Sequence, residues 1–244
     1  MLLWQRMRYT STNMSTLYIV STPIGNMGDM TYRAIEVLRS VDTILCEDTR
    51  VTGKLLKYYE IDNLDGSGKL MSYHANSSLT KVDQVIRMLQ SGKNLALVSD
   101  AGTPTISDPG VLLIQAINHL VPESKIVSVP GASAVVAALS LSGFIGNSFC
   151  FKGFVPHKKG RETLFKEIAV CKDIVIIYES PHRILKTLSA LSEHLGEREL
   201  CLAREITKLH EQTVRGTATE VRDYFEQHSD KVRGEFVLVI DKLA

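Results

Sequence analysis

The sequence lacks several features that would place it in a specialised class of protein. Its 244 residues include four cysteines, Cys46, Cys150, Cys171 and Cys201, with no C-x-x-C pair and no H-E-x-x-H motif. Cysteines this far apart are typical of reduced, buried thiols in a cytosolic protein, so neither disulfides nor a metal site are expected. No segment approaches the roughly 20 apolar residues of a membrane-spanning helix. We therefore expect a soluble, cytoplasmic protein that binds no metal.

An excess of charge of either sign is also missing. The chain carries 28 Lys and Arg against 27 Asp and Glu, a formal net charge of +1 at pH 7. The molecule as a whole is no polycation, so any affinity for nucleic acid must come from local patches. A chain of this length suits one large domain or two domains of about 120 residues each.

The first fifteen residues, MLLWQRMRYTSTNMS, contain Arg6 and Arg8 and no acid. Two interpretations stay open. The stretch is an overextended start, with Met14 directly before the first strand as the natural one, or it is an organelle transit peptide. We expect residues 1–15 to form a disordered extension.

After this extension, strand-like and helix-like segments alternate, which is typical of a mostly parallel sheet covered on both faces. Between residues 203 and 213 there is room only for a loop, so a hairpin is expected there. We predict an α/β protein of two domains with a cleft between them. Residues 1–130 are expected to form a mostly parallel five-stranded sheet, and residues 131–244 a mixed five-stranded sheet. The predicted strands are residues 17–20, 43–46, 70–73, 95–98, 126–129, 149–151, 174–178, 200–203, 213–215 and 236–240.

The turn SDAGTPTISDPG, residues 99–110, separates an apolar strand from a helical pattern. Open α/β sheets bind their ligands at such turns, beyond the carboxyl ends of the strands. Gly102 permits close approach of a ligand to the backbone. Asp108 followed by Pro109 predicts a helix N-cap. No such capping role is expected for Asp100, which is predicted to bind a ligand or, alternatively, to form a turn through its own side chain.

Two more turns of the first half follow apolar strands. TPIGNMGD, residues 22–29, lacks the spacing of G-x-G-x-x-G, which disfavours a dinucleotide. PGASA, residues 130–134, is a second rigid turn with small side chains. In EDTR, Asp48 is expected to cap the next helix, with Glu47 and Arg50 as a surface pair or as ligand-binding groups.

In the second half, ionisable groups gather after apolar strands. Glu179 ends one such strand, and residues 203–211, AREITKLHE, follow another. A charge run is usually a solvated face, but after a buried strand it can line a cleft. The stretch FKGFVPHKKGR, residues 151–161, mixes cations with two phenylalanines and has no acid. It is either a local nucleic-acid footprint or a solubilising loop whose phenylalanines anchor it in the core.

Six motifs occur in a fixed order: TPIGNMGDMTYRA, CEDTR, SDAGTPTISDPG, VPGASA, YESPHR and REITKLHE. Together they resemble the bacterial small-subunit ribosomal RNA cytidine 2'-O-ribose methyltransferases of the tetrapyrrole methylase superfamily, over residues 17–241. The resemblance implies two α/β domains, S-adenosyl-L-methionine (AdoMet) in the interdomain cleft, and usually a homodimer. The implied target is a cytidine ribose in the decoding region of small-subunit ribosomal RNA or of the 30S particle.

The resemblance also assigns the turns. The first one reads Thr22-Pro23-Ile24-Gly25-Asn26, unlike the GxGPG-like turn of tetrapyrrole-modifying relatives, and so favours the RNA branch. One departure is Ala75, where family members often carry an acid, although His74 and Asn76 are retained. The residues expected to hold AdoMet are Pro23, Asp100, Ala101, Gly102, Thr103, Pro104, Thr105, Gly131, Ala132, Ser133 and Ala134.

Methyl transfer to a ribose hydroxyl chiefly requires alignment of oxygen, methyl and sulfur. We predict that a residue beyond the apolar strands orients or deprotonates the hydroxyl, with the candidates Glu179, Arg204, Glu205 and Lys208. We also expect the target nucleotide to be extruded from its stack. The cations expected to bind RNA are Lys152, Lys158, Lys159 and Arg161. Two alternatives stay open, a tetrapyrrole methyltransferase and a non-catalytic RNA-binding assembly factor.

Overall fold

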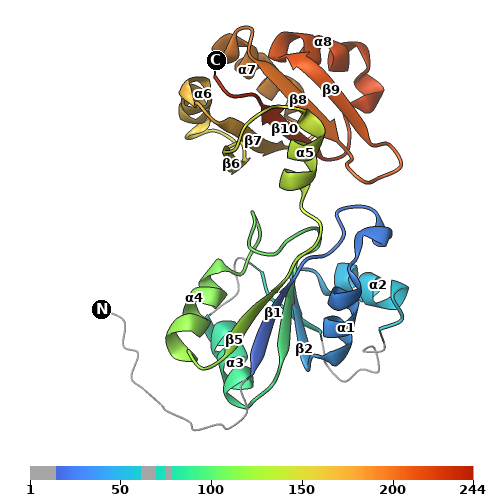
Figure 1. Cartoon of the computed structure of the whole chain (residues 1–244), viewed down its shortest axis with the longest axis vertical. Helices are drawn as coiled ribbons and strands as arrows, with labels where there is room; N and C mark the ends of the chain where they lie inside the picture. The colour runs from blue at the N-terminus through green and yellow to red at the C-terminus, as the bar shows by residue number, and fades with distance from the viewer. Residues whose placement is uncertain (1–14, 62–69, 75–78, 244) are drawn as a thin grey trace. The chain divides into compact units, whose positions relative to one another are not determined.

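The computed structural model describes residues 15–61, 70–74 and 79–243. The chain divides into two compact units, one running through Pro23 and over Met27–Ala132, the other made of Ile24–Asn26 and the chain from Ser133 onward. Each unit has its own five-stranded sheet (Figure 1). The expected extension lies outside the described residues except for Ser15, which is buried. In the described part of the chain, every helix is too short or too polar to cross a bilayer.

The first sheet is parallel throughout, as predicted, in the order β3-β2-β4-β1-β5. Helices α3 and α4 share one hydrophobic cluster with the sheet, and α1 and α2 share another, so each pair covers one face. Figure 1 shows the two pairs on either side of the strands. The elements are β1 (Thr16–Val20), α1 (Tyr32–Ser40), β2 (Thr43–Cys46), α2 (Thr49–Tyr58), β3 (Leu70–Ser72), α3 (Leu79–Gln90), β4 (Leu95–Val98), α4 (Val111–Leu120) and β5 (Lys125–Val129), with a 3-10 turn at Met27–Asp29.

The helix starts of this unit follow from local hydrogen bonding, with one correction. Asp48 caps α2 as predicted, because its side chain accepts a hydrogen bond from Arg50 N at 2.8 Å. The prediction that Asp108 caps α4 is wrong, since the helix begins at Val111 after Gly110, whose φ is 130°. A Cβ at Gly110 would lie 2.7 Å from a methyl of Leu97. The chain therefore turns tightly against the sheet at this glycine, two residues later than predicted.

The second sheet is mixed, as predicted, in the order β6-β7-β10-β8-β9. β6 is parallel to β7, β10 is antiparallel to β7 and β8, and β8 and β9 form the expected hairpin. Helices α6, α7 and α8 share the hydrophobic cluster on one face, and α5 packs against β8 and β10. The elements are α5 (Ala134–Ser142), β6 (Phe149–Phe154), α6 (Arg161–Val170), β7 (Ile174–Glu179), α7 (Ile184–Leu195), β8 (Glu199–Arg204), β9 (Gln212–Thr217), α8 (Ala218–Gln227) and β10 (Phe236–Ile240), with a 3-10 turn at Ser229–Lys231.

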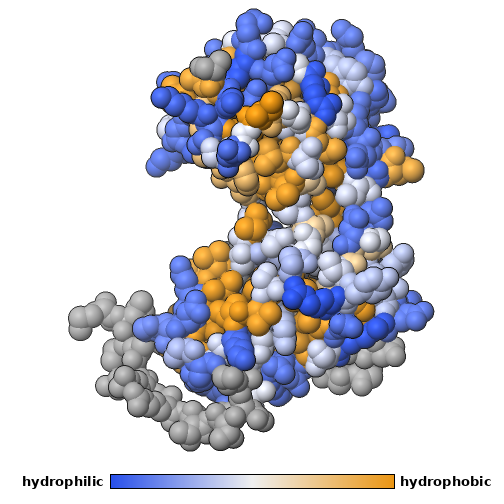
Figure 2. Space-filling view, viewed as in Figure 1, coloured by the Kyte–Doolittle hydropathy of each residue, from blue (hydrophilic) through white to orange (hydrophobic). Residues whose placement is uncertain are grey.

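The surface of the first unit is apolar over part of α4. Val111 is 49% exposed and Leu112 is 71% exposed, and Figure 2 shows apolar side chains gathered in this region. Ile106, in the loop before α4, is exposed as well. An exposed apolar patch of this kind is a candidate contact surface.

Candidate active site

The loops after β1 and β4 are joined at the carboxyl edge of the first sheet. Thr22 N donates to Gly102 O at 2.9 Å, and Gly102 N donates to Thr22 O at 3.1 Å. The Thr22 hydroxyl donates to Ser99 O at 3.0 Å. Gly102 has a φ of +87°, a conformation that favours glycine. The predicted ligand turn is thus held by the backbone of the first turn.

The loop after β5 joins the same arrangement. The Thr103 hydroxyl donates to Ala132 O at 3.1 Å and lies 2.9 Å from the Ser21 hydroxyl. A Cβ at Gly131 would come within 2.9 Å of the Ser21 Cβ, so this glycine is required by close packing. Three loops therefore form one rigid, small-residue cradle, which we call the three-loop cradle: residues 21–23, 99–105 and 130–132.

Nine of the eleven residues predicted to hold AdoMet lie in this cradle. Pro23, Gly102 and Pro104 are buried, and Asp100, Ala101 and Gly131 are exposed. Ser133 and Ala134 instead begin α5 of the second unit, with Ser133 at its N-cap. The small side chains and positioned backbone groups fit a ligand with several polar groups, such as an amino acid joined to a nucleoside. The predicted cleft between the units stays a prediction.

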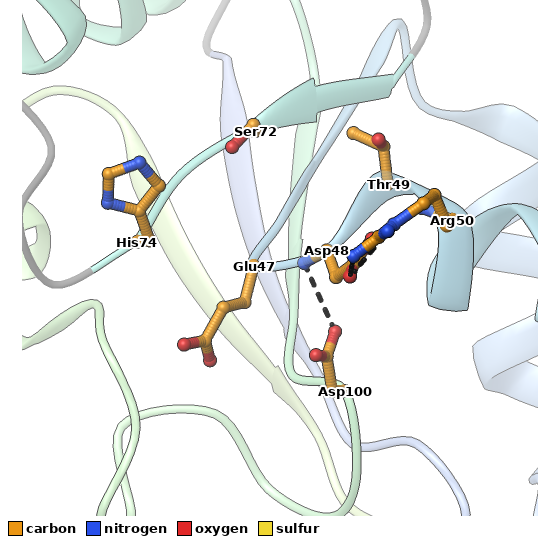
Figure 3. A pocket seen from close by; sticks show the side chains of 7 residues that line it. All are labelled: Glu47, Asp48, Thr49, Arg50, Ser72, His74 and Asp100. Carbon is orange, nitrogen blue, oxygen red and sulfur yellow. Dashed lines mark hydrogen bonds and ion pairs between the residues drawn. The ribbon is translucent and has the colours of Figure 1, made fainter.

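A hollow of about 500 Å³ lies beyond the carboxyl ends of β2, β3 and β4. Asp100 is common to the hollow and to the cradle, and its carboxylate accepts from Asp48 N at 3.2 Å (Figure 3). Arg50 pairs with Asp48 at 2.6 Å, so the expected surface pair with Glu47 does not form. The lining residues are Glu47, Asp48, Thr49, Arg50, Ser72, His74 and Asp100.

Sequence reasoning missed Ser72 and His74 as site residues, because their strand is short and the motifs nearby carry no obvious chemistry. The order β3-β2-β4 brings them beside Glu47 and Asp100. No local motif predicts the order of the strands in a sheet. The retained Asn76 and the departure at Ala75 lie outside the described residues.

The electrostatics of this edge are acidic. Burial raises the pKa of Glu47, and the nearby Asp100 and Asp108 raise it further. Burial also raises the pKa of Asp108, against the hydrogen bond from Ser99. Asp48 is the exception, since hydrogen bonds from Arg50 lower its pKa to about 2. An edge with several clustered carboxylates favours cationic groups and hydrogen-bond donors.

In the second unit, the Glu179 carboxylate is buried, and both of its oxygens have partners within the protein. It is 2% exposed, and its two carboxylate oxygens contact Arg183 at 2.6 Å and the Thr187 hydroxyl at 2.6 Å. Ser180 N donates to it at 2.7 Å, and Arg161 lies 3.7 Å away. Because its partners Ser180, Arg183 and Thr187 lie at the start of α7, Glu179 stabilises this end of the helix. This arrangement favours a positioning role over proton transfer.

Arg204 is also turned inward, whereas the loop it supports carries accessible charge. Arg204 is 4% exposed and donates to Arg233 O at 2.7 Å and to His210 O at 3.2 Å. The Lys208 ammonium lies 2.8 Å from Glu205 and 2.9 Å from Glu235. Burial would raise the pKa of Glu205, but the hydrogen bonds from Lys208 and from the Glu235 backbone outweigh it and lower the pKa.

The structure therefore brings three of the four predicted catalytic residues together, Arg204, Glu205 and Lys208. Glu179 and Arg204 both pair with Phe236 from opposite sides of β10, which places their backbones about 10 Å apart. Glu205 has a φ of 52° and Thr207 one of 68°. Backbone held in this region by surrounding contacts is typical of functional loops.

The short segment Ile24–Asn26 of the first turn packs on this loop. Asn26 N donates to the Thr207 hydroxyl at 3.1 Å. A Cβ at Gly25 would come within 2.4 Å of the Lys208 Cγ, so the loop fits only against a glycine. Sequence reasoning missed this contact, because Gly25 and Lys208 lie far apart in the sequence and in different predicted domains.

The four predicted RNA-binding cations differ in their surroundings. Lys158 and Lys159 are exposed, and Lys152 is paired with Glu167 at 3.1 Å. Arg161 points inward, donating to the Thr187 hydroxyl at 2.8 Å and lying 5.0 Å above the Phe165 ring. Phe154 in the same stretch is 56% exposed, with its ring 5.3 Å from that of Tyr178.

The chain is similar to several curated proteins over nearly its whole length. A relative from Bacillus subtilis named "Ribosomal RNA small subunit methyltransferase I" is 44% identical over 233 residues, covering 94% of this chain and 76% of the relative. A relative of the same name from Thermotoga maritima is 42% identical, covering 93% of this chain and 98% of the relative.

Solved structures show the same fold at lower identity. A diphthine synthase superposes with a TM-score of 0.67 at 13% identity, covering 93% of this chain and 90% of that one. A cobalt precorrin-4 methyltransferase of cobalamin biosynthesis gives a TM-score of 0.64 at 17% identity, covering 93% and 94%. The family described as Tetrapyrrole (Corrin/Porphyrin) Methylases matches residues 16–222. With this match and with relatives above 40% identity, the chain belongs to the tetrapyrrole methylase family.

Proposed function

We propose that this protein methylates the 2'-hydroxyl of a cytidine in the decoding region of small-subunit ribosomal RNA, with AdoMet as the methyl donor. The observation that carries the proposal is the end-to-end match to relatives named for small-subunit ribosomal RNA methylation, which covers 93% of this chain and 98% of the Thermotoga maritima protein. The first turn supports the RNA branch over tetrapyrrole substrates. The cytidine and the 2'-oxygen come from the resemblance of the six motifs.

AdoMet would be held by the three-loop cradle. When bound, it supplies an electrophilic methyl group on a positively charged sulfur. Gly102, with a φ of +87°, lets the backbone approach such a ligand closely, and Gly131 lets the first and third loops pack together. The loops are fixed by the hydrogen bonds of Thr22 and Thr103. Asp100 and Glu47 provide negative charge nearby, which suits a cationic ligand.

The chemistry depends on alignment more than on a strong base. Positioning can contribute about 7 to 11 kcal/mol, whereas a general base contributes about 10²- to 10⁴-fold. Of the four predicted residues, Glu205 and Lys208 are the accessible ones that we assign to the ribose hydroxyl. The lowered pKa of Glu205 keeps it an anion and an acceptor at neutral pH. Arg204 and Glu179 are positioning residues, since both are buried and bonded to the protein.

RNA would be held by local cations, because the net charge is only +1. Lys158 and Lys159 are the exposed members of the predicted set, and Lys152 contributes when it is released from Glu167. An internal ribose is reached by extruding its nucleotide from the stack. The homodimer and the cytoplasmic location belong to the same proposal, since the substrate is a ribosomal subunit or its RNA.

The decisive experiment incubates the protein with labelled AdoMet and small ribosomal subunits that lack the modification. We expect label on one cytidine of the small-subunit RNA, at a position where the neighbouring phosphodiester resists alkaline hydrolysis because the 2'-oxygen is blocked. Fully modified subunits are the control and should accept no label. Label on a base, or uptake by a tetrapyrrole instead of RNA, would refute the proposal. AdoMet binding without any transfer would favour the assembly-factor alternative.

A further inference from the structure

We propose a second, separate site, which binds a divalent cation of the zinc class at the edge of the second sheet. Its ligands would be the thiols of Cys150 and Cys171 and the carboxylate of Asp173, whose ligand atoms all lie within 4.8 Å of one another. The inference does not rest on the proposed function. It also revises the expectation from the sequence that this chain holds no metal.

The fold explains why residues so far apart in sequence meet. β6 and β7 run parallel, with Phe149 beside Ile174 and Cys150 beside Val175. Asp173 immediately precedes β7, and Cys171 ends α6 as its C-cap residue. The start of the edge strand therefore lies against the turn that joins α6 to β7. A cation there would tie these two segments together.

The donor set suits zinc. Two thiols and one carboxylate combine soft and hard ligands, which Zn²⁺ accepts in a tetrahedral arrangement with a water in the fourth position. Zinc–sulfur bonds of about 2.3 Å and zinc–oxygen bonds of about 2.1 Å place a sulfur and an oxygen of a tetrahedral site about 3.6 Å apart. Cys150 Sγ lies 3.8 Å from an Asp173 carboxylate oxygen, so little movement is needed.

The surrounding groups fix the ligands as outer-shell partners do in metal sites. The Ser148 hydroxyl donates to the other oxygen of Asp173. The Arg198 guanidinium donates to the backbone oxygens of Cys171 at 3.1 Å and of Asp173 at 3.3 Å, so it holds the turn through carbonyls. Lys152, two residues after Cys150 on β6, is paired with Glu167 at 3.1 Å.

The three side chains also face one another. Their two sulfurs and one carboxylate oxygen lie within 4.8 Å of each other, so a single cation among them would have all three as ligands. The competing use of the same geometry is a disulfide between the two cysteines.

Cobalt and zinc binding to the reduced, full-length protein would test the site. We expect one equivalent of Co²⁺ to give a thiolate-to-metal absorption band and tetrahedral d–d bands, and Zn²⁺ to displace it and raise the melting temperature. C150S and C171S should each weaken zinc binding by more than about 100-fold, because losing a ligand exceeds the about 10- to 100-fold loss typical of an outer-shell change. S148A should fall in that outer-shell range. C201A, which removes a buried thiol outside the cluster, should bind normally.

Four results would overturn the inference. The first is a cobalt spectrum without the thiolate band, and the second is a band that survives in both C150S and C171S. The third is alkylation of Cys150 and Cys171 at the same rate with and without zinc. A disulfide between them in protein purified without reductant, combined with no metal uptake after reduction, would replace the cation by a covalent link. Binding is read by spectroscopy and melting, so methyl transfer plays no part in the outcome.

Discussion

At the scale of single residues, Glu179 shows how a charged group can serve the fold when its place after a strand suggests chemistry. Its carboxylate is buried and receives hydrogen bonds from Ser180 N and from the Thr187 hydroxyl, with Arg183 at 2.6 Å. Removing one partner of such a pair leaves buried donors and charge unmatched. The same geometry keeps Arg161 turned inward, toward Glu179 and Thr187.

We therefore predict that E179A lowers the free energy of unfolding by about 3 to 5 kcal/mol, as is usual when a buried ion pair is broken. Urea unfolding followed by far-ultraviolet circular dichroism would measure it. E167A is the matched control, because its pair with Lys152 is exposed and is worth about 0 to 1 kcal/mol. Parental stability in E179A together with lost methyl transfer would instead assign this carboxylate to the chemistry.

Asp108 gives a prediction on pH. Burial raises its pKa, and Asp100 adds to the effect, so the ionised form is less favourable in the folded chain than in the unfolded one. The penalty is fully present above the raised native pKa and disappears as the pH falls below the unfolded value near 3.9. D108N removes the charge, so it should be more stable than the parent at pH 8.

The pH series supplies its own control. The advantage of D108N in urea midpoint should shrink as the pH is lowered from 8 to 4, because the parent carboxyl becomes protonated over that window. An advantage that stays constant over the series would show that the charge of Asp108 plays no part in the difference.

At the scale of strands, helices and loops, prediction from the sequence succeeded where one segment carries its own signal. Apolar runs such as residues 95–98 and 236–240 are long enough to be buried strands, and all ten predicted strands are found. The predicted start of α4 was wrong because the close contact with Leu97 leaves room only for glycine at position 110, a tertiary constraint that the local sequence does not show. The cradle was predictable because the carboxyl ends of parallel strands meet at one edge.

Other parts of the candidate site depend on contacts between distant segments. The contact of Gly25 with the loop at Lys208, and the approach of Cys150 to Cys171, have no local signature. Arg161 stands in a basic stretch that reads as an RNA footprint, yet the neighbouring Glu179 and Thr187 draw it inward. Sequence patterns fix which residues carry charge, while packing decides which of them face solvent.

Gly131 tests the three-loop cradle. A methyl group at this position would lie 2.9 Å from the Ser21 Cβ, so G131A must displace the first loop from the third. We predict that G131A weakens AdoMet binding by about tenfold or more in calorimetric titration, equal to about 1.4 kcal/mol. The matched control is G53A, in the middle of α2, where the nearest atom would be 4.0 Å away.

G53A should bind AdoMet normally and be up to about 1 kcal/mol more stable, because alanine is the better helix former. Equal AdoMet affinity in G131A and the parent would mean that the contact between Ser21 and Gly131 does not shape the cofactor site, and that the donor is held elsewhere.

At the scale of the whole molecule, positive and negative charges nearly cancel, so RNA binding would depend on local groups of cations and not on the net charge. A net charge of +1 gives RNA no general attraction, and acidic groups gather at the edge of the first sheet. Under the proposed function, we expect affinity for a ribosomal subunit to come from a few cations on the second unit. Lys158 and Lys159 are exposed, and so is Phe154 in the same stretch of sequence. This stretch therefore presents both cations and an aromatic side chain to solvent, the two kinds of group that bind single-stranded RNA.

Salt dependence tests this arrangement directly. Each cation that neutralises a phosphate releases counterions. Affinity therefore decreases with salt, and each such contact makes the slope of log affinity against log salt steeper by about 0.7 to 0.9. The double variant K158A/K159A should therefore bind small-subunit RNA more weakly, with a slope that is shallower by about 1.4 to 1.8 than that of the parent. K166A is the control, because Lys166 lies on α6 in an exposed pair with Glu162 and should leave the slope unchanged. An unchanged slope together with unchanged methyl transfer in the double variant would place the RNA on another surface. Loss of methyl transfer at high RNA concentration, with the slope unchanged, would give these two lysines a role in aligning the target rather than in holding phosphates.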